Sequence, residues 1–310
     1  ARTLLKLYGL DPKTVSASLS RTLLTSKDEV LLVEGTRILS QIADQDTVNT
    51  LITLLSSPYP EVKKHATWAL YRIRPAGNAK VIDELKKLVT GETESLEVRI
   101  NAVRGLGAIG SLTPNSTPQT AVWPTILTAL KMRDEKYTML RFYAVRALGD
   151  VHVADDEIID TLVRTVSREQ DTEIKREAVE TLRKLSVSDE RAEKALSDLL
   201  KGDGSPELKL AVAEALRDMG SPLLKEAASL MAVDGFSTTQ KKRLLYALSR
   251  STEQEAFTAC IDATKDEELK DFALALLDDA DTKALADVVL RRIQTENDKE
   301  VLAVLEYLKG

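Results

Sequence analysis

Apolar residues recur along this chain at the spacing that places them on one face of an α-helix. In residues 97–109 they are Val98, Ala102, Gly105, Leu106 and Ile109, the i, i+4, i+7, i+8, i+11 pattern of a helical face. Ala102 and Gly105 are small, so a second helix can approach this face closely. The pattern therefore predicts an amphipathic helix over 97–109 that packs tightly against a neighbour.

The same face returns nine times, at intervals of 29 to 42 residues, and an internal repeat of this length decides the architecture. The first core residue of each copy is, in order, Leu31, Val62, Val98, Leu140, Ile174, Leu208, Gln240, Leu269 and Val301. Four positions later stand Gly35, Ala66, Ala102, Ala144, Ala178, Val212, Leu244, Ala273 and Leu305. Eight positions later stand Leu39, Leu70, Leu106, Leu148, Leu182, Leu216, Leu248, Leu277 and Lys309. Only Gln240 and Lys309 break these three columns.

A second apolar segment precedes each of these helices, for example at 48–55 and 81–89. Breakers such as 57–60, 202–206 and 220–222, rich in Gly, Ser and Pro, separate the segments. An acidic residue often stands just before the first core residue, as Glu97 and Glu173 do, where it suits the positive end of a helix dipole. The sequence thus predicts an all-α protein of helix–turn–helix units stacked side by side.

The segment 97–107 and its echo at 140–149 resemble HEAT repeats of the phycobilisome-lyase type, and the resemblance covers nearly the whole chain. It implies a single right-handed α-solenoid of about nine HEAT-like helical hairpins over residues 1–310. The ends of the chain, 4–10 and 301–308, are apolar where solenoid ends normally carry a polar cap. We therefore expect the array to continue past one or both ends, or its ends to pack on something.

The amino-acid composition suits many small helix–helix interfaces better than one large globular core. Hydrophobic residues make up 43% of the 310 residues and aromatic residues 4%, so Leu, Ala, Val and Ile must form the core. No apolar run approaches the roughly 18 residues that would span a bilayer. The chain starts at Ala1 without a signal-like segment. We expect a soluble protein, cytoplasmic by default, and the sequence fits a mature secreted or periplasmic form as well.

The net charge of −6 is unevenly distributed. Residues 250–310 contain 15 acidic and 8 basic residues, whereas residues 1–249 contain 34 acidic and 35 basic ones. The acidity is therefore a property of the C-terminal end, and a basic groove elsewhere is compatible with the total.

Signatures of catalysis are missing from the sequence. His65 and His152 lie nearly three repeats apart, without a Cys or carboxylate at metal-ligand spacing. Neither belongs to the His-Glu pairs by which helical-repeat di-iron hydroxylases of similar fold bind metal. The single cysteine, Cys260, lies in an apolar helical stretch and is interpreted as a buried structural thiol. We expect no enzyme activity, no metal and no cofactor.

Two further features have a structural and a functional interpretation. The loop insertion at 111–120, which contains the glycosylation-like Asn115-Ser116-Thr117, is either a tolerated excursion or a contact loop over one edge of a groove. A basic residue follows the first core residue in seven repeats: Lys63, Arg99, Arg141, Lys175, Lys209, Lys241 and Lys270. Such a basic ladder is expected to pair with acids of neighbouring repeats; the alternative is a ridge that faces a ligand.

Positions two, six and nine after the first core residue point away from the core, onto the face that lines the concave side of HEAT-like stacks. On this face we predict a partner-binding strip: Lys64, Trp68, Tyr71, Arg104, Phe142, Arg146, Arg176 and Arg183. Exposed aromatic and arginine residues are typical binding anchors. The alternative is an ordinary solvated face. Further along, at Asp271 and Asp278, the strip becomes acidic.

We therefore expect a non-enzymatic protein–protein interaction scaffold that binds an acidic or extended partner segment on its concave face. One alternative is nucleic-acid binding, because some DNA glycosylases use a similar stack; the dense basic footprint of strong DNA binders is missing here. Another alternative, from the family resemblance alone, is a lyase or chaperone-type subunit like the phycobilisome lyases.

Overall fold

A computed structural model describes residues 11–112, 122–251, 253–279, 282–296 and 299–309, together with Gly9. All regular structure in these ranges is helical. Most of the 111–120 insertion, its glycosylation-like motif and the N-terminal leucines lie outside the described residues. The chain divides into two compact units, Ala1–Ile158 and Ile159–Gly310. The expectation of one continuous array over 1–310 stays a prediction.

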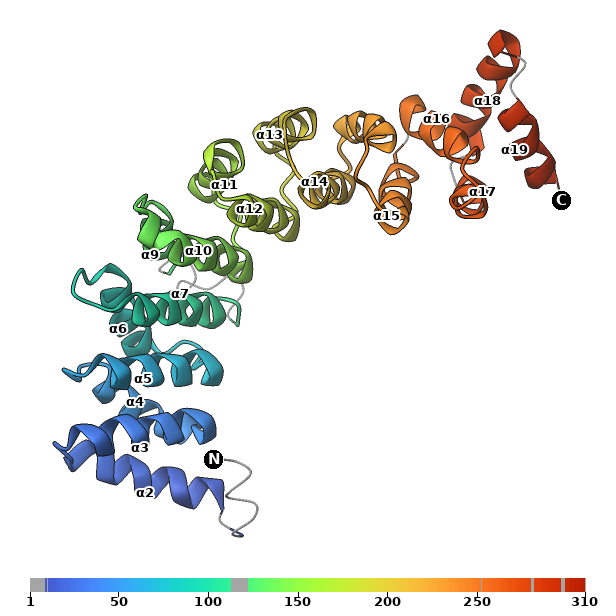
Figure 1. Cartoon of the computed structure of the whole chain (residues 1–310). Helices are drawn as coiled ribbons and strands as arrows, with labels where there is room; N and C mark the ends of the chain where they lie inside the picture. The colour runs from blue at the N-terminus through green and yellow to red at the C-terminus, as the bar shows by residue number, and fades with distance from the viewer. Residues whose placement is uncertain are drawn as a thin grey trace. The chain divides into compact units, whose positions relative to one another are not determined.

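In unit 1 the helices form two layers, one of first helices and one of second helices (Figure 1). The first helices are α2 (Pro12–Thr25), α4 (Val48–Leu54, preceded by the short η1, Gln45–Thr47), α6 (Ala79–Thr90) and α9 (Trp123–Leu130). The second helices are α3 (Glu29–Ile42), α5 (Pro60–Ile73), α7 (Leu96–Gly110) and α10 (Thr138–Val151, preceded by η2, Glu135–Tyr137). Each second helix contacts the next one along, from α3 to α10.

Unit 2 repeats this arrangement, and α11 (Asp156–Arg168) begins at the boundary. Its other first helices are α13 (Glu190–Lys201), η3 (Pro222–Ala232), α16 (Gln254–Ala263) and α18 (Thr282–Glu296). Its second helices are α12 (Thr172–Lys184), α14 (Pro206–Asp218), α15 (Thr238–Leu248), α17 (Lys270–Asp278) and α19 (Lys299–Lys309). Consecutive second helices contact one another here too. Within the described residues, each of the nine predicted repeats thus has its second helix.

Side-chain caps fix where the second helices begin. The side chains of Asp28, Ser95, Asp171, Ser205 and Ser237 each accept a hydrogen bond from a backbone N–H in the first helical turn. These caps satisfy donors that have no partner within the helix. The acidic residues that precede the core residues lie in the same first turns, where the helix dipole favours negative charge.

The three predicted core columns are buried in the middle repeats. Val98, Leu106, Leu140 and Leu148 have no exposed surface, and their counterparts in α5, α12 and α14 are at most 2% exposed. Gly107 permits a close approach of two helices, because a Cβ placed there would lie 2.8 Å from the Cβ of Ala147 on α10. The predicted register is therefore confirmed for these helices.

The prediction is wrong at one core position near each end of the repeat series. In α3 the side chain of Leu31 is 42% exposed and Leu32 is buried instead; in α19 Leu305 is 38% exposed and Val304 is buried. A middle helix is held between two second helices, whereas α3 contacts α5 on one side and α2 on the other. Gly35 and Leu39 in α3 and Val301 in α19 are buried as predicted, so the difference is confined to one core position in each helix.

The basic ladder is structural where its contacts are defined, but an acid is not always the partner. Lys63 forms the expected ion pair with Glu94 in the loop before the next second helix, with 2.6 Å between Nζ and Oε1. Arg99 is buried, donates to the carbonyl oxygen of Val89 at 2.9 Å, and reaches Met132 of the next repeat. Arg141 is also buried and donates to main-chain carbonyl oxygens of the loop between α9 and α10. For Arg99 the expectation of an acidic partner is wrong, because its guanidinium group donates to a carbonyl oxygen in the last turn of α6, which has no partner further along that helix.

We expect Leu148→Ala to lower the free energy of unfolding by about 2–5 kcal/mol, because the substitution leaves a cavity between tightly packed helices. Leu31→Ala is the matched control, and its loss should stay below about 1 kcal/mol because Leu31 is largely in solvent. Denaturant titrations of the three proteins measure both changes. Equal losses for the two variants would contradict the observed burial.

Arg99→Met should lower the free energy of unfolding by about 1–3 kcal/mol, because it leaves the Val89 carbonyl without its charged donor. Lys270→Met removes a cation at the same repeat position of α17, where the side chain is exposed, and should change stability little. Thermal melts followed by circular dichroism compare the two. If Arg99→Met and Lys270→Met melt at the same temperature, Arg99 does not stabilise the fold and the structural interpretation of the basic ladder is wrong.

Candidate partner-binding surface

The centre of the predicted strip in unit 1 is an arginine stacked against three aromatic rings. The guanidinium carbon of Arg104, on α7, lies 4.8 Å from the ring centroid of Trp68, 4.4 Å from that of Tyr71 and 5.0 Å from that of Tyr143. Trp68 and Tyr71 are three residues apart on α5 and so share a face, and Tyr143 comes from α10. We call these four residues the arginine–aromatic cluster. Each stack is attractive and holds the plane of the guanidinium group.

Beside the cluster lies a cavity of about 300 Å³, lined by Tyr71, Arg74, Arg104, Tyr143, Arg146, Ala147 and Asp150. Within the described part of the chain, the side chains of Arg74, Arg104 and Arg146 make no hydrogen bond or ion pair with any residue. Asp150 is the one acidic residue in the lining. The cavity wall therefore carries three guanidinium groups and one carboxylate.

Two other predicted strip residues in unit 1 have local roles. Lys64 forms an ion pair with Glu61 on its own helix. Phe142 packs edge-on against Tyr143, with 5.3 Å between the ring centroids. Tyr143 and Arg74 were not predicted as site residues. Tyr143 falls three positions after a core residue, close to the buried stripe, and Arg74 is the residue that ends α5, so neither occupied an outward position of the repeat pattern.

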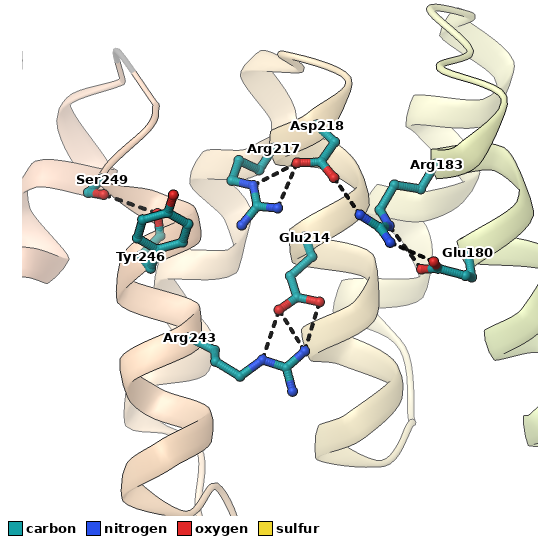
Figure 2. Close-up of polar contacts among 8 residues, drawn as sticks. All are labelled: Glu180, Arg183, Glu214, Arg217, Asp218, Arg243, Tyr246 and Ser249. Atoms are coloured by element: carbon teal, nitrogen blue, oxygen red, sulfur yellow. Dashed lines mark hydrogen bonds and ion pairs between the residues drawn. The ribbon is translucent and has the colours of Figure 1, made fainter.

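In unit 2 the predicted arginines are neutralised by the chain's own acids. Arg176 pairs with Glu173 on the same helix at 2.5 Å. Arg183 pairs with Glu180 on α12 and, at 2.8 Å, with Asp218 on α14 (Figure 2). The same arrangement continues along the unit, where Arg217 also binds Asp218 and Arg243 binds Glu214 (Figure 2).

A groove of about 430 Å³ along α12, α14 and α15 confirms this acidic character. Its charged lining residues are Glu173, Arg176, Glu177, Glu180, Glu207, Glu214 and Arg243, which is five acids against two bases. The strip was predicted from positions that are equivalent in every repeat. Its arginines are without an acidic partner in unit 1 and paired in unit 2. That the two parts form one continuous strip stays a prediction.

The ion pairs of unit 2 shift the titration of their carboxylates. Hydrogen bonds from Arg183 lower the pKa of Glu180 below its ordinary value. Partial burial raises the pKa of Asp218, but the hydrogen bonds from Arg183 and Arg217 outweigh it, so the pKa of Asp218 is also lowered. The same two acids raise the pKa of Arg183. Unit 2 is therefore more stable when these carboxylates are charged.

The residues weighed for catalysis have ordinary surroundings. His65 is half-buried, and its pKa is lowered by burial and by the neighbouring Lys64. Cys260 is buried, as predicted, and burial raises the pKa of its thiol to about 12. Among the described residues, no three His, Cys, Asp or Glu side chains come together as a metal site would require. No helix in the described ranges has the length and apolarity needed to cross a membrane.

Comparison with known proteins places this fold in a family. The family model of HEAT repeats matches residues 17–95 and 124–217, more than half of the chain, and the chain belongs to the HEAT-repeat family. A crystal structure of an engineered protein is similar, with 23% identity, a TM-score of 0.57, and coverage of 95% of this chain and 87% of the other. The X-ray structure of YibA from Escherichia coli has 14% identity, a TM-score of 0.58 and coverage of 97% and 96%. At these identities the likeness shows the fold alone. The comparison with curated proteins gives no match.

The lowered pKa values of Glu180 and Asp218 predict a stability that depends on pH. Carboxylates of this kind stabilise the fold above their unfolded pKa values, near 4, and lose that contribution as the pH falls through their folded values. Asp218→Asn should therefore lower the stability of the chain by about 0.5–1 kcal/mol at pH 7, and the difference from the parent should be smaller at pH 3. Asp203→Asn, in the exposed loop after α13, is the control and should match the parent at both pH values. Urea titrations at the two pH values test this, and a constant difference for Asp218→Asn would contradict it.

Proposed function

We propose that this HEAT-repeat protein is a non-catalytic scaffold, and that unit 1 binds an acidic, extended segment of a partner protein. The binding surface would consist of Trp68, Tyr71, Arg104, Tyr143 and Arg146, with Arg74 at its edge. These residues lie on α5, α7 and α10, three consecutive second helices. The fold supports a scaffold in general; the choice of surface and partner rests on the residues of unit 1.

One observation carries the choice of surface: the difference between the arginines of the two units. In unit 2, Arg176, Arg183 and Arg243 each have a carboxylate of the chain as partner. In unit 1, Arg74, Arg104 and Arg146 have none among the described residues. Bringing three guanidinium groups together with only one carboxylate, that of Asp150, in the same cavity wall costs free energy, and an acidic partner would recover it. Charge complementarity therefore favours an acidic ligand at unit 1.

The aromatic residues favour a segment of a protein as the ligand over a small free anion. Trp, Tyr and Arg are the residues that most often dominate binding energy at protein interfaces. Packed helix axes are about 8–10 Å apart, which corresponds to roughly three residues of extended chain. A segment that crosses α5, α7 and α10 would thus place an acidic side chain over each helix if acids recur about every third residue. Bidentate pairing with a carboxylate would use the free N–H edge of each guanidinium group.

The test measures binding of a fluorescently labelled, extended peptide with Asp or Glu at every third position. Trp68→Ala and the charge reversal Arg146→Glu should each weaken binding by about 1–3 kcal/mol, or roughly 5- to 150-fold, while the melting temperature stays unchanged. Arg37→Gln is the matched control: it removes an arginine of the preceding second helix that already pairs with Glu34, and it should have little effect.

A DNA duplex of similar length, tested in the same assay, distinguishes peptide binding from nucleic-acid binding. Nucleic-acid binding would be recognised by an affinity that falls steeply with salt and is lost in Arg104→Glu and Arg146→Glu. We expect negligible DNA binding at physiological salt, because the chain carries a net charge of −6. Tight DNA binding with no peptide binding would overturn the proposed scaffold function.

A further inference from the structure

The cavity beside the arginine–aromatic cluster has the charge and the donors of a site for one doubly charged anion. We infer that it binds the phosphate monoester group of a phosphorylated side chain in the partner segment. This inference rests on the proposed function and makes it more specific: the acidic segment is recognised through one phosphorylated residue held by Arg74, Arg104 and Arg146.

The charge of the lining selects a dianion. Three guanidinium groups and the carboxylate of Asp150 give the wall a net charge of +2. A glutamate or aspartate side chain supplies one negative charge and would leave the wall positive. A phosphate monoester carries about −1.5 to −2 at neutral pH and has three terminal oxygens that accept hydrogen bonds. A phosphate diester, as in nucleic acids, carries one negative charge. It therefore neutralises the cavity wall no better than a carboxylate does.

The three arginines are placed to act together. They come from α5, α7 and α10, so the group would be held from three consecutive repeats. Arg104 is already ordered by its rings, and little side-chain entropy is lost when its free edge binds an oxyanion. The cavity, at about 300 Å³, suits a single side-chain group with its phosphate rather than a larger ligand.

The backbone at Arg74 makes a clean test of its side chain possible. Arg74 ends α5 in the left-handed conformation, with a φ of 52°. Glycine is the usual residue at such a position, because any side chain there is strained. Arg74→Gly therefore keeps or improves the local backbone and removes only the guanidinium group from the cavity.

The first experiment titrates the full chain with three small probes and measures heat by calorimetry. Phenyl phosphate, a dianionic monoester, should bind at least tenfold more tightly than benzoate or diphenyl phosphate, which are monoanions with the same ring. Arg74→Gly and Arg146→Gln should each weaken phenyl phosphate binding fivefold or more, with the melting temperature equal to the parent's or, for Arg74→Gly, higher. Arg37→Gln should leave the dissociation constant within twofold. Equal affinity for phenyl phosphate and benzoate, or unchanged binding in both cavity variants, would overturn the inference.

The second experiment compares an acidic peptide that carries one phosphoserine with the same peptide that carries glutamate there, and with free O-phosphoserine. A phosphopeptide that binds at least tenfold more tightly than both others supports the inference. If the glutamate peptide binds equally well in a manner sensitive to Trp68→Ala, the scaffold function stands and the phosphate inference fails. If free O-phosphoserine binds as tightly as the phosphopeptide, the cavity is a site for free phosphate monoesters and the partner segment is ruled out as the source.

Discussion

The close packing of successive second helices is the constraint on which the rest of the structure depends. Gly107 and Ala147 let α7 and α10 approach until a single methyl group at residue 107 would collide. At such separations the long side chains on the flanks of neighbouring helices must meet. Arg104 contacts rings on both of its neighbours for this reason, and Arg183 reaches an acid on the next helix in the same way. The arginine–aromatic cluster and the ion pairs between repeats are thus consequences of the small residues in the core.

Arginine has three distinct uses in this chain, and the surroundings decide which one applies. In the basic ladder, Arg99 and Arg141 are buried and donate to main-chain carbonyl oxygens at loop ends, which fixes one helix against another. Along the predicted strip in unit 2, arginines join carboxylates into inter-repeat pairs. Along the strip in unit 1, Arg104 stacks on aromatic rings, which attract a cation without neutralising its charge. The first two uses are complete within the chain, and the third leaves hydrogen-bond donors available.

Membership of the HEAT-repeat family fixes the scaffold and leaves the activity open, because one fold supports many functions. What the chain binds is therefore decided by particular side chains. A repeat protein offers an internal comparison that other folds lack, since equivalent positions recur on successive helices. Where one repeat pairs its arginine and another does not, the difference comes from the side chains and not from the fold.

The sequence by itself determined the helices, their order and the buried columns of the middle repeats, because amphipathic periodicity is local and was repeated nine times. It also identified Trp68, Tyr71, Arg104 and Arg146 as outward-facing residues. The tertiary structure decided the exposure of Leu31 in α3 and Leu305 in α19, where the neighbours differ, and the partners of long charged side chains. It also added Tyr143 and Arg74 to the site, since contacts across repeats join residues more than 30 positions apart. The helical periodicity of a sequence predicts the direction in which a side chain leaves its own helix. Whether a charged side chain is paired depends on which residues the neighbouring helix places beside it.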